Sequence, residues 1–317
     1  MFTHQKKSIG AIQLILAMIL SGTVGIFATE AQSIVQTSFN VVFFRCLFGV
    51  IFMATFCVLR GYFKDTGLDK RKLILILLGG ACIVFNWVLL FKSFDLITKS
   101  GAGTGGITLG TVVYHTQPFY VVLLGAFFFK ETITMNKIGW IIAAFIGVVL
   151  VTDIIKFSTS SFDFNESYFQ GIICSLVAAF LYGCSTIIGK GLKGVRPHIT
   201  TLIQVTLGSI LLFPFVTFDL VPMTIDKHWL YLGGMGLIHT CIMYVLMYSA
   251  YPKLPTPLIA VLSFIYPVMA VFFDYLIYGH TIHWLQGLGI ALIILGGLGV
   301  NLNWSLKPSF SKVKNFA

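Results

Sequence analysis

One arginine interrupts a strongly apolar stretch of this sequence. Arg45 follows Phe43 and Phe44, and Leu47 stands two residues later. An ionisable side chain inside a membrane helix costs about 2.5–3.5 kcal/mol on insertion scales, so its presence calls for an explanation. A guanidinium that faces a cavity can hold a carboxylate or a phosphate through paired hydrogen bonds. The alternative is structural: Arg45 bonds a helix carbonyl, pairs with Glu30, or extends to the membrane surface.

Three other titratable side chains in apolar stretches are candidates for carrying a proton: His115, His239 and Asp274. Histidine changes its charge near physiological pH. Asp274 follows Pro267 by seven residues and therefore shares its helix face, where a carboxylate can take up a proton or hold an ammonium group. Each has a structural alternative. Each histidine stays neutral in a hydrogen bond between helices, or Asp274 reaches the outer membrane surface.

Deep aromatic and amide side chains are the candidates for contacting an organic ligand. Aromatic rings can stack on such a ligand or surround a cation, and a buried tyrosine hydroxyl needs a partner or water. Amides either join helices or line a polar path. The candidates are Trp87, Tyr114, Tyr244, Tyr248, Tyr266, Asn86, Gln117 and Gln204.

Two prolines inside predicted helices, Pro118 and Pro267, are the candidate hinges. Proline has no backbone N–H, so it frees a carbonyl one turn earlier and kinks the helix. A static kink is the alternative interpretation.

The elements that must position these residues follow from composition. Of the 317 residues, 57% are hydrophobic and 10% are charged, whereas soluble globular proteins carry roughly 25% charged residues. The apolar residues form long blocks, and a helix needs about 20 of them to cross a bilayer. The blocks are too continuous for the alternating strands of a membrane barrel, which have about ten residues each. We therefore predict an all-α integral membrane protein with ten transmembrane helices, over residues 10–29, 38–60, 73–94, 106–128, 136–155, 169–189, 199–218, 229–248, 255–278 and 282–303.

The distribution of basic residues predicts the orientation of these helices. Placing the N-terminus inside puts sixteen of the 21 Lys and Arg residues in inner segments and four outside. Because basic residues concentrate in cytoplasmic loops, we expect both termini to be cytoplasmic, in a protein of the cytoplasmic membrane. This topology also explains the net charge of +10 without a nucleic-acid partner. The basic loop over residues 60–72 either only orients the helices or also contacts anionic lipid headgroups.

The two halves of the chain resemble each other. In each half a proline opens an apolar stretch that leads through a short polar turn to a Gly-rich helix. The corresponding positions are Pro118 with Pro267, Gly10 with Gly171, Gly22 with Gly183, and Arg45 with Gln204.

This repeat predicts the organisation of the chain. We expect a five-helix repeat over residues 1–155, a polar outer linker over 156–168, a second five-helix repeat over 169–303, and a basic cytoplasmic tail over 304–317. Because five is odd, the second repeat enters the membrane from the opposite side. Inverted repeats of this kind form a cavity near the midplane and move by alternating access.

Four short motifs stand at characteristic points of these helices. They are Phe43-Phe44-Arg45, Gln117-Pro118, Lys130-Glu131 and Tyr266-Pro267. With them, the chain resembles the EamA family of the drug/metabolite transporter superfamily over nearly its whole length. The resemblance implies ten helices in inverted halves, a cavity lined by both halves, and transport of amino-acid-like or other small metabolites, often outward. The chain departs from the family pattern in having His280 in place of a glutamate and an apparent insertion over residues 99–106.

The function expected from these features is secondary transport of a small organic metabolite, an amino acid or a related carboxylate or amine. Proton coupling, facilitated exchange and efflux are the options for its mode. We expect no cofactor and no metal site, because the six cysteines lie in apolar spans without CxxC spacing. The expected partners are a small-molecule substrate and the lipid bilayer, and the choice between monomer and homodimer stays open. The alternatives are an intramembrane enzyme, for which HExxH and GxSxG motifs are missing, and an assembly subunit of a membrane complex.

Overall fold

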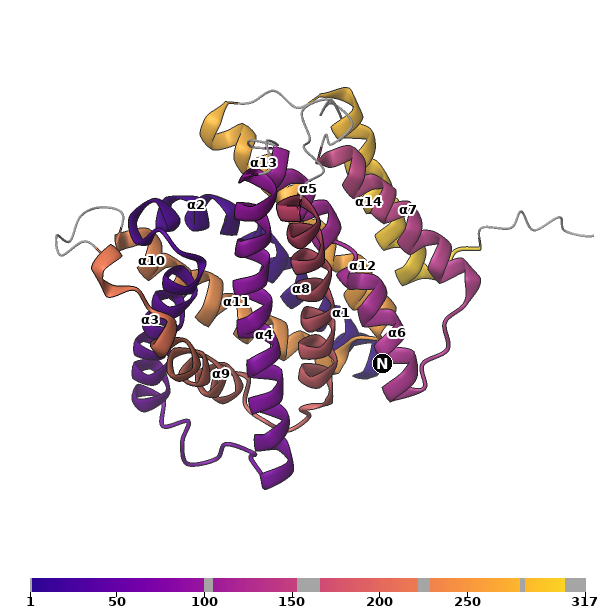
Figure 1. Ribbon diagram of the computed structural model, residues 1–317. Helices are drawn as coiled ribbons and strands as arrows, with labels where there is room; N and C mark the ends of the chain where they lie inside the picture. The colour runs from indigo at the N-terminus through magenta and orange to yellow at the C-terminus, as the bar shows by residue number, and fades with distance from the viewer. Residues whose placement is uncertain (1, 100–104, 153–165, 222–228, 280–282, 306–317) are drawn as a thin grey trace, which may run out of the picture.

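The computed structural model describes residues 2–99, 105–152, 166–221, 229–279 and 283–305, and every regular element in these ranges is helical (Figure 1). The α-helices are α1 (Phe2–Ser21), α2 (Val24–Val35), α3 (Ser38–Leu59), α4 (Lys70–Ile97), α5 (Gly105–Tyr114), α6 (Gln117–Phe129), α7 (Met135–Val151), α8 (Glu166–Gly191), α9 (Pro197–Leu212), α10 (Trp229–Gly236), α11 (Met243–Ala250), α12 (Thr256–Ser263), α13 (Ile265–Tyr278) and α14 (Trp284–Leu302). Between α10 and α11 runs a π-helix, η6 (Leu237–Ile242). Short 3₁₀ turns are η4 (Phe213–Phe215), η5 (Phe218–Leu220) and η7 (Tyr251–Lys253).

Eight described helices are long and apolar enough to cross a membrane, and the bent pair α1–α2 makes a ninth. Helix α7 is apolar but only 17 residues long, or about 26 Å at 1.5 Å per residue, against a hydrocarbon core of about 30 Å. Length and composition therefore support eight or nine spans, where the sequence predicted ten. The difference arises at residues 136–155, because α7 ends at Val151 and residues 153–155 lie outside the described ranges.

The two predicted proline helices are each broken into two segments. The first breaks between α5 and α6, just before Pro118, and the second at Phe264, between α12 and α13 and three residues before Pro267. Proline fits the first turn of a helix, where its missing N–H has no intrahelical partner to lose. Both prolines thus lie in the first turn after a break, and each pair of segments still counts as one span.

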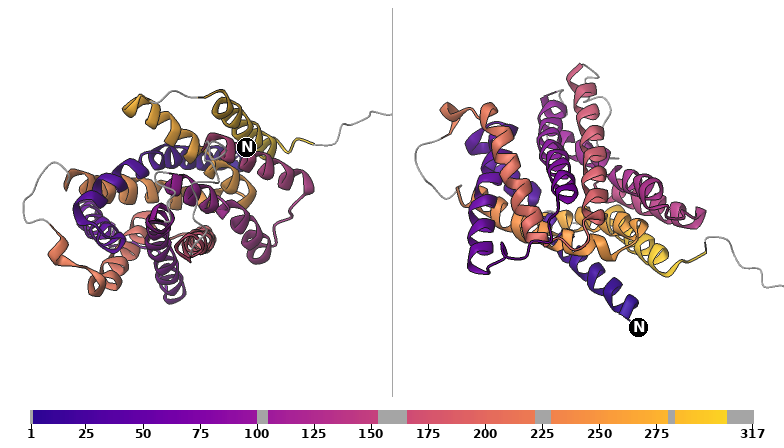
Figure 2. Two further views of the ribbon diagram at one scale, coloured as in Figure 1. Left: turned by 45° about the horizontal axis from the view of Figure 1, so that its top comes forward. Right: turned by 90° about the horizontal axis from the view of Figure 1, so that it is seen from below.

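Glycines allow several helix pairs to pack closely. Helices α4 and α8 run side by side (Figures 1 and 2), as do α7 and α14. A Cβ added at Gly147 of α7 would lie 2.7 Å from the carbonyl oxygen of Gly289 in α14, so a larger residue would force these two backbones apart.

Large apolar side chains cover much of the outer surface. Phe127 is 78% exposed and Leu230 is 75% exposed, and many other Leu, Ile and Phe side chains are similarly open. Soluble proteins rarely expose contiguous apolar patches of this extent. Together with the long apolar helices, this surface identifies a multi-pass membrane protein.

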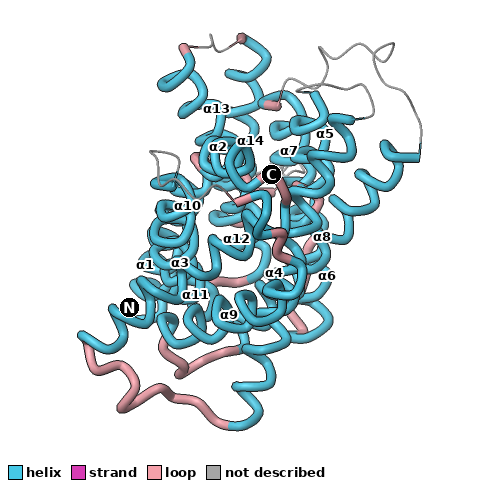
Figure 3. The backbone as a smooth tube through the Cα atoms, turned by 60° about the vertical axis from the view of Figure 1, so that its left-hand side comes forward, coloured by secondary structure: helices cyan, strands magenta, loops and turns pink. Residues whose placement is uncertain are grey.

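One end of the bundle carries the loop that joins α3 to α4, residues 60–69, drawn in pink at the bottom of Figure 3. Asp69 caps α4 by accepting a hydrogen bond from the Lys72 backbone N–H at 2.8 Å. That bond is the main reason why the pKa of Asp69 lies below its usual value. Arg196, at the start of α9, donates to the backbone oxygen of Asp65 and so fixes the loop against the second half of the chain.

Candidate functional site

A small cavity of about 70 Å³ lies at the centre of the bundle. Its wall comes from both halves of the chain and includes six of the residues singled out from sequence. The lining residues are Met18, Ser21, Val24, Arg45, Trp87, Leu90, Phe91, Tyr114, Gln117, Tyr182, Met243, Tyr244, Met247 and Tyr266.

Arg45 is the charged member of this wall, and it is only 2% exposed. Its Nε donates to the Thr240 hydroxyl at 2.8 Å and its Nη2 donates to the His239 carbonyl oxygen at 2.7 Å. Its guanidinium carbon lies 4.0 Å from the ring centroid of Trp87, a cation–π arrangement. Within the described part of the chain no carboxylate pairs with it. Arg45 is therefore a buried cation held by neutral groups.

The acceptors for Arg45 come from the π-helix η6. The Thr240 hydroxyl accepts from Arg45 and donates to the Met235 carbonyl oxygen at 2.8 Å, which orients it. π-Helical turns are rare and often occur at functional sites. Here the wide turn contributes both oxygens that fix the guanidinium.

Aromatic side chains form most of the remaining wall. The indole N–H of Trp87 donates to the Tyr244 hydroxyl at 3.0 Å. The Asn86 amide donates to the Tyr114 hydroxyl at 3.2 Å and to the Ala178 carbonyl oxygen at 2.7 Å. Asn86 thus joins α4, α5 and α8, and both tyrosine hydroxyls are held in place beside the cavity.

Two polar atoms at the break between α5 and α6 have no hydrogen-bond partner among the residues that the structure describes. They are the Gln117 side-chain oxygen, whose residue lines the cavity, and Nε2 of His115. The His115 ring stacks on Tyr266, with centroids 5.2 Å apart and planes 10° apart. A buried polar atom without a partner costs free energy, so these groups are suited to receive a ligand or water.

Three predicted site residues, Gln204, Tyr248 and His239, do not line the cavity. Gln204 accepts a hydrogen bond from the Tyr248 hydroxyl at 2.6 Å and so joins α9 to α11. The His239 ring lies 2.8 Å from the Thr23 hydroxyl, at the bend between α1 and α2. Asp274 is part of α13, but its side chain lies outside the described residues, as do His280 and residues 100–104 of the predicted insertion.

Sequence reasoning missed several lining residues, of which Ser21 and Tyr182 are the most informative. Both are next to a glycine of the repeat, Gly22 and Gly183, so the alignment of the halves sets one opposite the other. That correspondence was the available signal. The lining residues Met18, Met243 and Met247 carry no such signal, because apolar residues fill every span.

An ion pair lies beyond the cavity, about 12 Å further along α8 than Tyr182 at 1.5 Å per residue. Lys190 donates to the Glu131 carboxylate, which also accepts from the Thr256 hydroxyl and, at 2.9 Å, from the Thr256 backbone N–H. Partial burial alone would raise the pKa of Glu131, but the hydrogen bonds from Lys190 and Thr256 outweigh it and hold that pKa below its usual value. We call this cluster the Glu131 clasp. It ties the turn after α6 to α8 and α12.

Comparisons with known proteins agree with this architecture. The chain is 32% identical over 294 residues to the uncharacterized transporter YxxF of Bacillus subtilis (strain 168), covering 93% of this chain and 90% of that protein. It is 27% identical over 268 residues to a probable amino-acid metabolite efflux pump of Salmonella typhimurium, covering 80% and 82%. It is 24% identical over 295 residues to the riboflavin transporter ImpX of Fusobacterium nucleatum, covering 90% and 95%.

One solved crystal structure aligns with 95% of this chain and 99% of its own chain, with a TM-score of 0.77 at 15% identity, which shows a shared fold. The sequence pattern of the EamA-like transporter family matches twice, over residues 8–153 and 169–302. This confirms the resemblance inferred from the short motifs. The chain belongs to the EamA-like transporter family.

Proposed function

We propose that this protein is a secondary transporter that moves a small carboxylate-bearing metabolite, such as an amino acid or its derivative, across the cytoplasmic membrane. The observation that carries the proposal is Arg45. Its buried guanidinium lines the central cavity and has only neutral partners among the described residues. A substrate carboxylate would supply the missing negative charge, and a charge-assisted hydrogen bond is about twice as strong as a neutral one.

The groups around Arg45 suit an organic carboxylate. Trp87, Tyr244 and Tyr266 offer aromatic surface, and the unpartnered Gln117 oxygen can accept from a substrate N–H or O–H. The names of the relatives include both an amino-acid metabolite efflux pump and a riboflavin transporter. The carboxylate preference therefore rests on Arg45 alone, and it is the part of the proposal to test first.

Alternating access would follow from two inverted five-helix halves, and matched contacts support that arrangement. A Cβ added at Gly22 would lie 2.6 Å from Cβ of Met269, and one at Gly183 would lie 3.0 Å from Cβ of Tyr120. Met269 and Tyr120 each stand two residues after a candidate hinge proline. Corresponding glycines thus meet corresponding positions.

A second pair of contacts shows the same correspondence between the two halves. Gly49 of α3 packs on Val205 of α9, while Gly208 of α9 packs on Cys46 of α3. Position 46 aligns with 205, as Arg45 aligns with Gln204. The packing of helix pairs shows the same relation between the halves: α4 packs on α8, and α1 packs on α11. Rocking of the two halves about Pro118 and Pro267 is the movement we propose.

Coupling to protons would involve His239, His115 or Asp274. His239 is the best placed, because its carbonyl holds Arg45 while its ring contacts Thr23 in the other half. A proton on this ring would add a positive charge beside Arg45 and change the field at the substrate. Efflux is the proposed direction, with both termini in the cytoplasm.

The test compares small-molecule pools inside and outside cells that overproduce the protein, measured by mass spectrometry. We expect a few related carboxylates to shift across the membrane with the intact protein and not with Arg45→Ala. Arg45→Lys, which keeps the charge but not the planar donor pair, should retain part of the activity. Lys6→Ala, which removes a charge from an exposed site on α1, is the matched control.

The shifted compound is then assayed in proteoliposomes against its amide analogue. Competition by the acid and not by the amide supports the carboxylate site. Equal pools with intact protein and Arg45→Ala, with both present in the membrane in equal amounts, would overturn the role of Arg45.

A further inference from the structure

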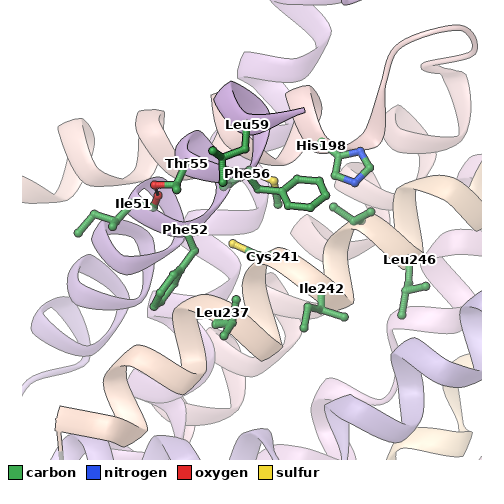
Figure 4. Close-up of a pocket in the computed structure, with 12 residues that line it drawn as sticks. Ile51, Phe52, Thr55, Phe56, Leu59, His198, Leu237, Cys241, Ile242 and Leu246 are labelled. Atoms are coloured by element: carbon green, nitrogen blue, oxygen red, sulfur yellow. Dashed lines mark hydrogen bonds between the residues drawn. The ribbon is translucent and has the colours of Figure 1, made fainter. Parts of the chain in front are cut away.

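A second, larger hollow lies on the lipid-facing surface, between α3 and the η6–α11 segment. This groove has a volume of about 610 Å³, and Figure 4 shows the side chains that line it. Its lining is almost entirely apolar: Ile51, Phe52, Met53, Thr55, Phe56, Leu59, His198, Leu237, Cys241, Ile242, Val245 and Leu246. Such a volume is typical of ligand pockets, which measure about 300–1,000 Å³.

The dimensions of the groove fit one leaflet of a bilayer. Along α3 it extends from Ile51 to Leu59, eight residues or about 12 Å. Half of the hydrocarbon core is about 15 Å. The groove is therefore long enough to hold an acyl chain from one leaflet, and Leu59 is at the end of α3 that faces the proposed cytoplasmic side.

Basic and aromatic side chains gather at that same end. The His198 ring stacks on Phe56 at 5.3 Å and lies 4.9 Å from the ring of Tyr62. The guanidinium of Arg60 lies 5.7 Å from the Phe56 ring centroid, and that of Arg196 lies 4.9 Å from the Tyr62 centroid.

These two arginines differ in their ion pairs. Arg196 forms an ion pair with the exposed carboxylate of Asp65, with Nη2 and Oδ2 3.4 Å apart. Arg60 pairs with no carboxylate among the residues that the structure describes. The cytoplasmic end of this apolar groove is thus positively charged, which complements a lipid phosphate at the membrane surface.

We propose that this groove binds an anionic glycerophospholipid, with one acyl chain lying along α3 and the phosphate beside Arg60 and Arg196. The floor of the groove is the π-helix that holds Arg45. Leu237, Cys241 and Ile242 face the groove, while His239 and Thr240 of the same turn bond the Arg45 guanidinium. A bound acyl chain therefore supports the segment that positions Arg45, and this second consequence rests on the proposed function.

Binding is measured on the purified full-length protein in detergent, by native mass spectrometry and by thermal unfolding. The probes are phosphatidylglycerol and phosphatidylcholine with identical acyl chains. We expect phosphatidylglycerol to bind more tightly and to raise the unfolding temperature more. Equal binding of the two lipids would overturn the proposal, since the groove would then hold apolar chains without regard to the headgroup.

Two variants locate the site, each with a matched control. Arg60→Gln should weaken phosphatidylglycerol binding about fivefold, the effect expected of one basic residue near a lipid surface. Lys64→Gln removes the same charge from the same loop and should leave binding unchanged. Ile242→Trp, which fills the groove from its exposed side, should displace the lipid, whereas Leu123→Trp on the exposed face of α6 should not.

If Lys64→Gln weakens binding as much as Arg60→Gln, or if Leu123→Trp displaces the lipid as Ile242→Trp does, the lipid is attracted to the surface in general and the site is wrong. None of these binding measurements depends on transport. A protein that fails to transport any carboxylate can still show the lipid site, so failure of one proposal is distinguishable from failure of the other.

Discussion

The central cavity and the lateral groove are opposite in size and in chemistry. The cavity holds about 70 Å³ and is bounded by a buried arginine, four tyrosines and a glutamine whose amide oxygen has no partner among the described residues. The groove holds about 610 Å³ and is bounded by apolar side chains. In a membrane protein a large apolar hollow faces lipid, so volume alone does not identify a substrate site. The polar groups that the fold buries are the better guide.

The two hollows share one wall, which allows the comparison to be tested with neighbouring residues. Thr240 contacts Arg45 on the cavity side and Cys241 lines the groove. Thr240→Val removes an acceptor from a charged group, a loss of about 1.5–3 kcal/mol. We expect uptake or efflux at low substrate concentration to fall by about 10- to 100-fold in proteoliposomes. Cys241→Val should stay within about twofold of the original protein, and a similar loss in both variants would mean that the whole turn had been disturbed.

The Glu131 clasp gives the next largest effect, on stability instead of transport. Its carboxylate has a lowered pKa in the folded protein, against about 4.3 when unfolded. The ionised clasp therefore stabilises the fold above about pH 4.3, and this contribution is lost as pH falls through the lowered folded value. At pH 7 we expect Glu131→Gln to reduce the free energy of unfolding by about 1–2 kcal/mol.

Thermal unfolding in detergent between pH 3 and pH 7 checks this prediction. The difference in stability between Glu131→Gln and the original protein should be constant above about pH 4.3 and should narrow toward pH 3, as Glu131 is protonated. Asp95→Asn, which breaks an exposed pair with Lys99 at 2.7 Å, should change stability by less than about 1 kcal/mol at any pH. A difference that stays constant down to pH 3 would show that Glu131 acts through packing and not through its charge.

A smaller effect is expected from replacing Trp87 in the cavity, compared with replacing Trp229. Trp229 lines another lateral groove, between α3 and α10. Trp87→Phe keeps a ring over Arg45 but weakens the cation–π contact and removes the hydrogen bond to Tyr244. A cation–π contact is worth about 0.5–2 kcal/mol, so we expect substrate affinity to fall roughly threefold to tenfold. Trp229→Phe should leave affinity unchanged. Equal substrate affinities of the two variants would show that Trp87 does not contribute to substrate binding.

The smallest effect is expected inside the groove itself. Thr55 lines it and donates within its own helix, to the Ile51 carbonyl oxygen at 2.7 Å. Thr55→Val should change both transport and unfolding free energy by less than about 0.5 kcal/mol. A larger loss of transport would indicate that substrate passes through the groove, and it would end the distinction between the two hollows.

Much of the fold was predictable because a bilayer imposes simple rules. Long apolar blocks predicted helices, and the ranges agree with α3, α4 and α8 to within about three residues, whereas α9 ends six residues before the predicted end of its span. The breaks were harder. A π-helix between α10 and α11 depends on packing around Arg45, and a break before Pro118 depends on neighbours that local sequence does not reveal.

The candidate site was predictable only where polarity is rare. Arg45, Gln117 and Tyr114 stood out because apolar helices seldom contain such residues, and the structure places all three around one cavity. Gln204 and Tyr248 looked equally promising, yet they bond each other and do not line the cavity. Polarity alone does not tell which face of a helix points inward, so a substrate contact and a helix-to-helix hydrogen bond look the same in sequence.

The π-helix also has an evolutionary consequence. It closes its hydrogen bonds one residue later than an α-helix does, so it contains what amounts to one inserted residue. Deleting a single residue from Leu237–Ile242 would restore an ordinary helix and rotate one flank against the other by about 100°. The oxygens that hold Arg45 would turn away, while the composition of the span would hardly change. Relatives of the same hydrophobicity can therefore acquire or lose an arginine-based site through a change in length alone, which a comparison of residue types would overlook.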